Sequence, residues 1–160
     1  MKKRMLLLSG AAMIAMSLSG QTAAAAAATP APATPVVTKT KVSAPSAAPA
    51  SSAAPAASCP VVRYGYTGNA MCYTWAMDVD WYGDGRRLET FLVAPNRTVW
   101  HAWPGSGGWR LMPGNKTADD MENAWWSGTT RNISVWVNHP TVFWCISDPG
   151  SGWTGVWRDC

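Results

Sequence analysis

Residues 97–109 read RTVWHAWPGSGGW, and residues 141–153 read TVFWCISDPGSGW. Each stretch has a short run of β-branched and aromatic residues, a turn sequence of Pro, Gly and Ser, and a closing Trp. Runs of this composition favour β-strands, and Pro and Gly favour tight turns. The two stretches therefore predict the same element twice, a strand followed by a chain reversal.

The similarity belongs to a longer repeat with a shift of 44 residues. Residues 77–93 (MDVDWYGDGRRLETFLV) align without a gap on residues 121–137 (MENAWWSGTTRNISVWV). The aligned pairs include Met77–Met121, Trp81–Trp125, Arg87–Arg131, Trp100–Trp144 and Trp109–Trp153. Self-similarity at this period is typical of propeller blades and other stacked β units. We expect two copies of one unit, 77–109 and 121–153, packed on each other through the last two Trp pairs.

Turn sequences divide each copy into hairpins. APNRT (94–98) separates LETFLVA from the next strand-like run, and NHPT (138–141) stands at the corresponding place before VFWCI. TGN (67–69) divides two further strand-like runs at the front of the domain. The predicted fold class is all-β: two blade-like antiparallel repeats of 44 residues plus an N-terminal hairpin, crosslinked by disulfides.

Residues 83–114 (GDGRRLETFLVAPNRTVWHAWPGSGGWRLMPG) resemble one blade of the tectonin-like and PLL-type lectin β-propellers. Those blades carry a Gly-Arg-Leu-acid-x-Phe-Val run, a turn, Val-Trp-His-x-Trp and then Gly-Gly-Trp. Residues 127–157 match more loosely, and residues 59–76 lie outside the pattern. The resemblance implies a lectin-like scaffold.

The sugar site of that family does not carry over to this chain. Two-blade sugar-binding propellers place an Arg within an inner strand and a Glu on the next strand. The nearest positions here hold Thr90 and Ser134, and the following strands hold His101 and Cys145. The resemblance therefore implies a scaffold without identifying its ligand.

Two copies are fewer than the roughly four to eight blades that close a propeller. Two arrangements are compatible with the sequence. Several chains can close one ring as a homo-oligomer, or the two copies can face each other in a compact pseudo-twofold β domain. The second arrangement needs no partner chain, and the additional cysteines favour it.

The start of the chain predicts export. Residues 1–28 have the basic start, the short apolar core and the Ala-rich cleavage region (22–28) of a secretory signal peptide. Residues 29–58 hold almost only Ala, Pro, Thr, Ser and Val and predict a disordered linker, either a tether to a surface or a spacer. Residues 59–160 are the predicted Trp-rich domain, which we expect to be secreted and extracellular.

The charge of the domain argues against two classes of partner. Residues 59–160 hold eight basic residues and nine acids, which gives a net charge of −1, although the whole chain carries +4. A nucleic-acid binder needs a basic stripe, which this domain lacks. No apolar run after the signal peptide approaches the length of a membrane span. We expect neither nucleic acid nor a membrane span.

The domain contains four cysteines: Cys59, Cys72, Cys145 and Cys160. An even number in a small exported domain predicts two disulfides. The local pairing, Cys59–Cys72 with Cys145–Cys160, is favoured, while the nested pairing of Cys59 with Cys160 and Cys72 with Cys145 stays open. The spacing does not match paired metal ligands, so neither a metal nor another cofactor is expected.

Most of the eleven Trp residues are expected in the core, and those without a partner in the repeat, such as Trp103 and Trp126, are the better candidates for a binding site. A sugar ring can lay its C–H face on an indole, while its hydroxyls bind planar charged groups. Arg131 is expected to brace Trp rings, and His101 to pack within a strand. The candidate ligand-binding residues combine aromatic and charged side chains near loops: Trp103, Trp126, Tyr82, Arg87, Glu89 and Asp84.

These features favour a secreted, non-catalytic, lectin-like module whose partner is a glycan or a cell-surface polysaccharide. The alternative is a secreted protein-interaction or inhibitor domain without sugar binding. A hydrolase ranks third, because the sequence holds no nucleophile elbow, no metal-binding His pair and no phosphate-binding loop.

Overall fold

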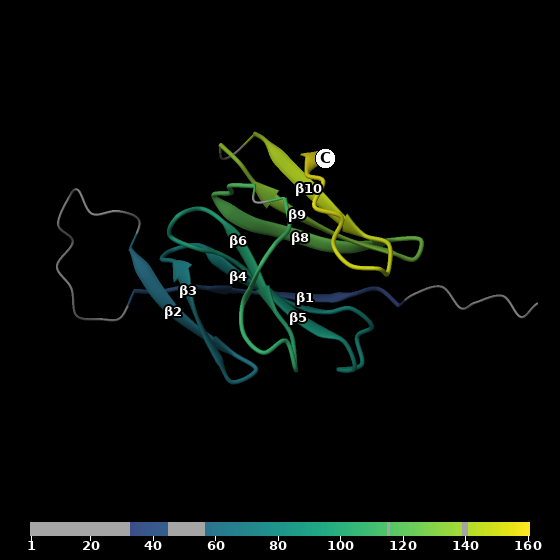
Figure 1. Cartoon of the computed structure of the whole chain (residues 1–160), viewed down its shortest axis with the longest axis horizontal. Coiled ribbons are helices and arrows are strands. Elements are labelled where there is room, and N and C mark those ends of the chain that lie inside the picture. The colour runs from purple at the N-terminus through teal and green to yellow at the C-terminus, as the bar shows by residue number, and fades with distance from the viewer. Residues whose placement is uncertain (1–32, 45–56, 115, 139–140) are drawn as a thin grey trace, which may run out of the picture.

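The computed structural model describes residues 33–44, 57–114, 116–138 and 141–160. Within these ranges the chain forms strands and turns (Figure 1), which confirms the all-β class. None of the described segments is a helix that could cross a membrane. The predicted signal peptide (1–28) lies outside the described residues.

The strands form three antiparallel sheets. The five-stranded sheet has the order β1 (Val36–Lys41), β4 (Trp75–Asp80), β5 (Leu88–Val93), β6 (Val99–Ala102) and β7 (Arg110–Leu111). The four-stranded sheet has the order β11 (Arg158–Asp159), β10 (Phe143–Asp148), β9 (Thr130–Trp136) and β8 (Asp120–Ser127). The two-stranded sheet, which we call the front hairpin, consists of β2 (Ser58–Arg63) and β3 (Tyr66–Met71).

The predicted repeat corresponds to two antiparallel meanders. Strands β4 to β7 pair in chain order and form the first repeat, and β8 to β11 pair in the same way and form the second repeat. Each repeat thus has the topology of a four-stranded blade. The two blade-like units are present in one chain, and closure into a propeller remains a prediction.

A β-bulge in β8 shifts the correspondence between the first strands of the two repeats, β4 and β8, by one residue. The register of β8 against β9 slips between Met121 and Asn123. In β4 the buried positions are Met77 and Val79, and Trp81 continues the alternation directly after the strand. In β8 the inward positions are Met121, Ala124 and then Trp126. The predicted pairing of Trp81 with Trp125 is therefore wrong, because the extra residue of a bulge reverses which side chains face the core.

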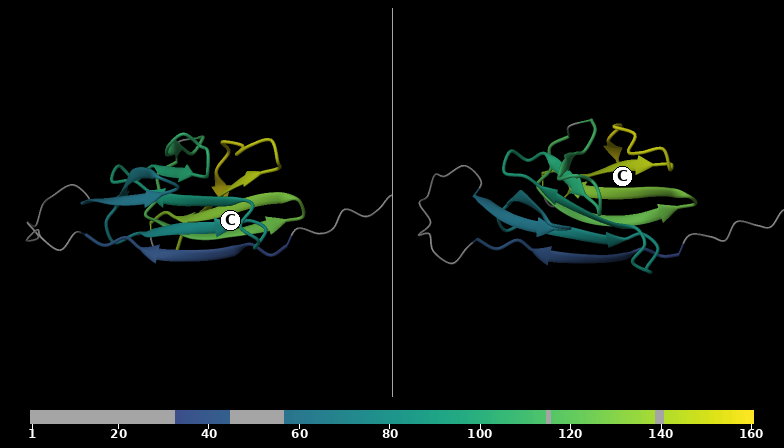
Figure 2. Two further views of the ribbon diagram at one scale, coloured as in Figure 1. Left: turned by 90° about the horizontal axis from the view of Figure 1, so that it is seen from below. Right: turned by 60° about the horizontal axis from the view of Figure 1, so that its bottom comes forward.

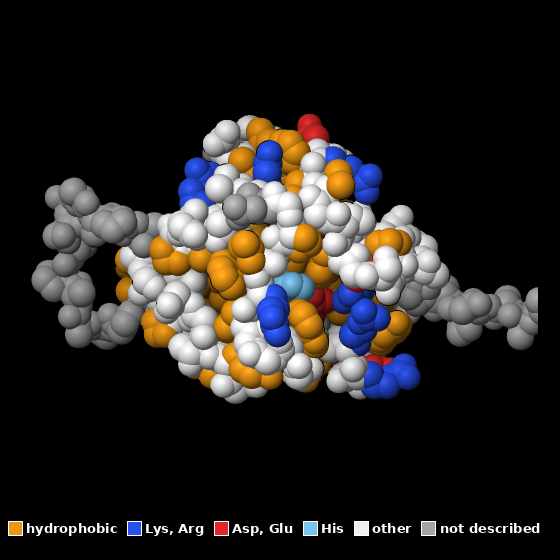
Figure 3. All heavy atoms as spheres, in the orientation of Figure 1, with side chains coloured by type: hydrophobic (Ala, Val, Ile, Leu, Met, Phe, Trp, Pro, Cys, Tyr) orange, Lys and Arg blue, Asp and Glu red, His pale blue; other side chains and the backbone are white. Residues whose placement is uncertain are grey.

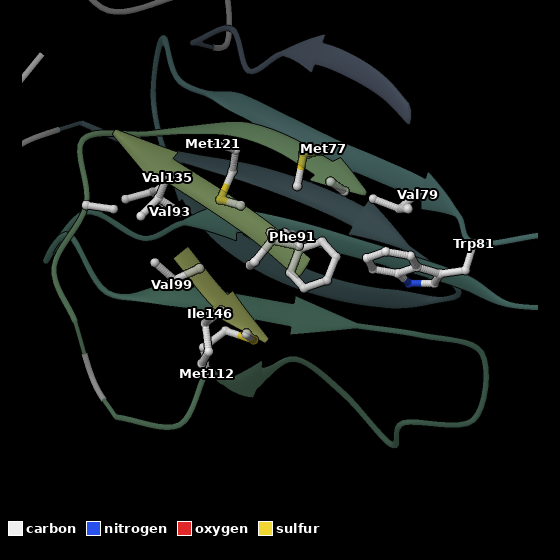
Figure 4. Close-up of a cluster of buried hydrophobic side chains, with 13 residues drawn as sticks. Met77, Val79, Trp81, Phe91, Val93, Val99, Met112, Met121, Val135 and Ile146 are labelled. Carbon is white, nitrogen blue, oxygen red and sulfur yellow. The ribbon is translucent and has the colours of Figure 1, made fainter. Parts of the chain in front are cut away.

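The main core lies between the two larger sheets. Figure 2 shows the four-stranded sheet lying against the five-stranded one, and Figure 4 shows their inward side chains meeting. Alternate residues point inward, as the period of two in a strand requires. The most deeply buried members are Met77, Val79, Trp81, Phe91, Val93, Val99, Met112, Met121, Val135, Ile133 and Ile146. Each such side chain contributes about 1.5–3 kcal/mol by burial.

Strand β1 corrects the prediction of a disordered linker over residues 29–58. It lies within that range and pairs with β4 from Val36 opposite Asp80 to Lys41 opposite Trp75. Val37 packs against the main core, and Lys39 donates a hydrogen bond to the carbonyl of Glu122. The sequence VVTKTK is rich in β-branched residues, which suit an edge strand when a neighbouring strand supplies the pairing. Residues 29–32 and 45–56 of the predicted linker lie outside the described residues.

The disulfides follow the local pairing. Cys59–Cys72 joins the front hairpin to the residue after β3, with a Cα–Cα distance of 5.1 Å. Cys145–Cys160 links β10 to the last residue of the chain, with a Cα–Cα distance of 5.4 Å. Both separations are normal for a disulfide. The favoured pairing is confirmed, and the nested pairing is excluded.

The Trp pairs of the repeat have different surroundings. Trp153 lies between the repeats, with its ring centroid 5.6 Å from that of Phe91 and 6.2 Å from that of Trp81. Trp100 and Trp109 instead pack on a second apolar cluster with the front hairpin. The prediction that both pairs join the two copies is therefore wrong for Trp100 and Trp109, because the hairpin occupies that face of the first repeat.

Candidate ligand-binding cavity between the repeats

A cavity of about 530 Å³ opens where the two repeats meet, and we call it the first cavity. Figure 3 shows this face of the molecule, on which a histidine lies in a hollow among charged and hydrophobic side chains. The first repeat supplies Arg86, Arg87, Leu88, Glu89, His101, Trp103, Pro104 and Pro113. The second repeat supplies Arg131, Asp148, Gly152 and Trp153. A cavity of this size accommodates a small organic ligand.

The carboxylate of Glu89 lies at the floor of the first cavity and accepts four hydrogen bonds. Its Oε1 accepts from His101 Nδ1 at 2.6 Å and from Trp153 Nε1 at 3.1 Å. Its Oε2 accepts from Arg131 Nη1 at 2.6 Å and from Trp81 Nε1 at 2.9 Å. The four donors come from both repeats, so this carboxylate fixes the geometry of the floor.

The donors keep Glu89 charged in spite of its burial. Burial by itself raises the pKa of a carboxyl, because it removes water from the anion. Here the hydrogen bond from His101 and the positive charge of Arg131 outweigh burial, and the pKa of Glu89 lies below its ordinary value. The residue is therefore suited to accept hydrogen bonds and not to donate a proton.

Arg131 connects Glu89 with a second carboxylate, Asp148, to which its Nη2 donates. Burial raises the pKa of Asp148, but the backbone N–H groups of Gly150 and Gly152 and the Arg131 guanidinium lower it to a net value below the ordinary one. The guanidinium carbon of Arg131 also lies 5.1 Å from the ring centroid of Trp81 and 5.3 Å from that of Trp153. The predicted bracing of Trp rings by Arg131 is confirmed.

Trp103 forms an aromatic wall beside this charged floor. Its side chain follows β6 and is 37% exposed. Its ring centroid lies 5.0 Å from that of His101, with the ring planes tilted by 48°. In the same loop Ser106 donates to the carbonyl of Gly108, and Arg110 donates twice to the carbonyl of Ser106. The loop thus presents an exposed indole on an internally bonded frame.

Three of the six candidate ligand-binding residues lie together in the first cavity: Trp103, Arg87 and Glu89. Among the described residues no hydrogen bond or ion pair is formed by the side chain of Arg87, which is exposed at the rim. The sequence places these three residues within one repeat, and the structure gathers them at its junction with the other.

The other three candidates lie elsewhere. Asp84 is on an exposed turn, where it forms an ion pair with Arg86, and a backbone hydrogen bond from Arg86 lowers its pKa. Tyr82 and Trp126 pack on each other with ring centroids 5.7 Å apart. The indole of Trp126 donates to the carbonyl of Trp81 at 2.7 Å, so it joins the two repeats and packs against the core.

Sequence reasoning missed His101, Asp148 and Trp153 as cavity residues. For His101 the alternation of side chains along strands gave a signal. Glu89 and Phe91 are two residues apart and share one face of β5, and His101 lies directly opposite Phe91 on β6, so His101 and Glu89 lie on the same face. Asp148 and Trp153 belong to the second repeat, and their approach to Glu89 depends on how the two sheets pack.

The arrangement offers fixed hydrogen-bonding groups, a free guanidinium at the rim and an exposed indole. Among the described residues no three His, Cys, Asp or Glu side chains come close enough together to bind a metal ion. Comparison of the chain with family models, with curated proteins and with solved structures found no match.

Proposed function

We propose that this protein is a secreted, non-catalytic module that binds a carbohydrate in the first cavity. The observation that carries the proposal is the exposed indole of Trp103 beside the bonded floor of Glu89, His101 and Arg131. An indole face suits the C–H face of a sugar ring, and fixed polar groups beside it suit its hydroxyls. Secretion is supported by the signal-peptide pattern and by the two disulfides.

The state of the floor favours binding over catalysis. A glycosidase needs a carboxylic acid that can donate a proton, and such a group has a raised pKa. The carboxylates of Glu89 and Asp148 have lowered pKa values and are already hydrogen-bonded to Arg131. They serve better as permanent acceptors that orient the surrounding donors.

We also propose that one chain suffices for the site. Both repeats contribute to the first cavity, and the core between them is filled by side chains of the same chain. The cavity therefore needs no second copy to be complete. A solution mass equal to one chain supports this arrangement, and a mass equal to several chains supports a ring.

Screening on an array of plant, bacterial and animal glycans tests the proposed function, with titration calorimetry of the best-binding glycan. Trp103→Ala should weaken that binding by about tenfold, because loss of ring contact is worth about 1.4 kcal/mol or more. Tyr73→Asn is the matched control: Tyr73 is an exposed aromatic residue, 66% accessible, and does not line the first cavity. Asn tolerates the positive φ of 68° at this position. If no glycan binds, or if Trp103→Ala binds as tightly as the unchanged chain, the proposed function is wrong.

A further inference from the structure

A second cavity of about 460 Å³ lies between the front hairpin and the first repeat. We infer that this second cavity binds an uncharged saccharide, independently of the first cavity. Its walls combine two indole rings, Trp100 and Trp109, with the loop residue Asn96 and residues 67–69 of β3. None of the described residues that line it carries a charge. The first cavity, in contrast, is lined by three arginines and two carboxylates.

The two indoles are held in place by bonds to the protein. Trp100 Nε1 donates to Thr98 Oγ1 at 2.8 Å, and Trp109 Nε1 donates to the carbonyl of Tyr66 at 3.3 Å. Both side chains are half-buried and pack on the apolar cluster beneath the front hairpin. Because their N–H groups already have acceptors, the rings offer a ligand their carbon surface, which is what the C–H face of a neutral sugar requires.

Gly68 shows how closely the front hairpin approaches Trp109. A Cβ atom at residue 68 would lie 2.6–2.8 Å from three atoms of the indole, so that position has no space for a larger residue. The neighbouring residues Thr67 and Asn69 pair with Val62 and Pro60, so their side chains lie on the other face of the hairpin and only their backbone borders the cavity. The polar side chain beside the indoles is Asn96: its Oδ1 accepts from the N–H and the hydroxyl of Thr98, which holds Trp100, and its Nδ2 can donate to a sugar hydroxyl.

The corresponding Trp residues of the second repeat have different surroundings. Trp144, which corresponds to Trp100, is covered by the ammonium of Lys116 at 3.6 Å from its ring centroid. Trp153, which corresponds to Trp109, faces the first cavity instead. The second cavity therefore depends on the front hairpin, which the Cys59–Cys72 disulfide closes on itself. One chain then carries two binding sites of different chemistry.

The test measures four neutral probes: cellohexaose, chitohexaose, mannohexaose and xylohexaose. Each is titrated by calorimetry into the full chain carrying Trp103→Ala, which disables the proposed first site. We expect at least one hexasaccharide to bind this variant. Adding Asn96→Asp should weaken binding by about fivefold, the effect of one lost hydrogen bond, because the carboxylate keeps the contacts to Thr98 but lacks the Nδ2 donor. Val62→Ala, an exposed change on the same hairpin, should have no effect.

The inference is overturned if none of the four probes binds the Trp103→Ala variant, or if adding Asn96→Asp leaves their binding unchanged. A peptide with the sequence of residues 44–57 (APSAAPASSAAPAA) is titrated in parallel, because aromatic grooves also bind Pro-rich peptides. Binding of the peptide alone, sensitive to Asn96→Asp, would replace the saccharide as the ligand and overturn the inference. A different result overturns the proposed first site: Trp103→Ala alone leaves the affinity for the best-binding glycan of the array unchanged.

Discussion

Arg131 of the second repeat donates to Glu89 of the first repeat at 2.6 Å, and both side chains are almost fully buried. This ion pair crosses from the four-stranded to the five-stranded sheet and forms the floor of the first cavity. The residues that shape the candidate site therefore also hold the two repeats together.

Replacing Arg131 should destabilise the fold strongly. Arg131→Met leaves Glu89 and Asp148 as buried anions without their shared cation, and losing one partner of a buried pair costs about 3–5 kcal/mol. Chemical denaturation with urea measures the loss. Lys39→Met is the control, because Lys39 and Glu122 are each 33% exposed and such pairs contribute about 1 kcal/mol or less. Equal losses in the two variants would contradict the structural role of the Arg131 pair.

Stability should decrease in acid. The folded-state pKa values of Glu89 and Asp148 lie below their ordinary values of 4.5 and 3.8. Near these values the unfolded chain binds more protons than the folded chain, so stability is retained above them and is lost as the pH falls toward the folded-state pKa values. Urea midpoints between pH 7 and pH 3 should follow this course.

Substitution of the two carboxylates identifies their share of the acid sensitivity. Glu89→Gln and Asp148→Asn should each flatten the dependence of the urea midpoint on pH, because an amide does not titrate in this range. Either variant suffices if the other fails to fold. A dependence as steep as that of the unchanged chain in both variants would assign the acid sensitivity to other carboxyl groups.

The segment around β1 should be part of the stable domain. A chain starting at residue 33 should unfold at the same urea concentration as the full chain, whereas a chain starting at residue 45 should be less stable by about 2 kcal/mol or more. The second truncation removes the strand partner of β4 and the buried side chain of Val42, which is 6% exposed. It also leaves β4 as an open edge that favours aggregation. Identical midpoints for the two truncations would show that β1 is dispensable.

Gly68→Ala should disturb the front hairpin. The added Cβ would overlap the indole of Trp109, and forcing an extra carbon into a packed site costs about 1–3 kcal/mol. Urea denaturation and the Trp emission spectrum should both change. Thr67→Ala, an exposed change at the neighbouring residue, serves as the control. If Gly68→Ala is as stable as Thr67→Ala, the close approach of Trp109 to the hairpin is not present in solution.

Much of the architecture was predictable from neighbouring residues in the chain. The order of the strands within each repeat, the turn at 94–98 and the local cysteine pairs depend on residues close together in the chain, and the structure has the corresponding meanders and disulfides. The predicted turn at TGN (67–69) is wrong: these residues lie within β3, and the front hairpin turns at Tyr64 and Gly65. Strand β1 was missed because its Val and Thr residues stand in an Ala/Pro-rich context, and its pairing with β4 bridges more than 30 residues. The bulge in β8 was missed because an ungapped alignment hides a one-residue change of face.

The candidate site was likewise predictable only in part. Trp103, Arg87 and Glu89 were identifiable because they lie in one repeat, among aromatic and charged neighbours. Their meeting with Arg131, Asp148 and Trp153 depended on the packing of two sheets, and that packing is decided by non-directional burial of many side chains together. Local alternation can indicate which face a residue occupies, but the partner across the interface emerges only when both faces are packed.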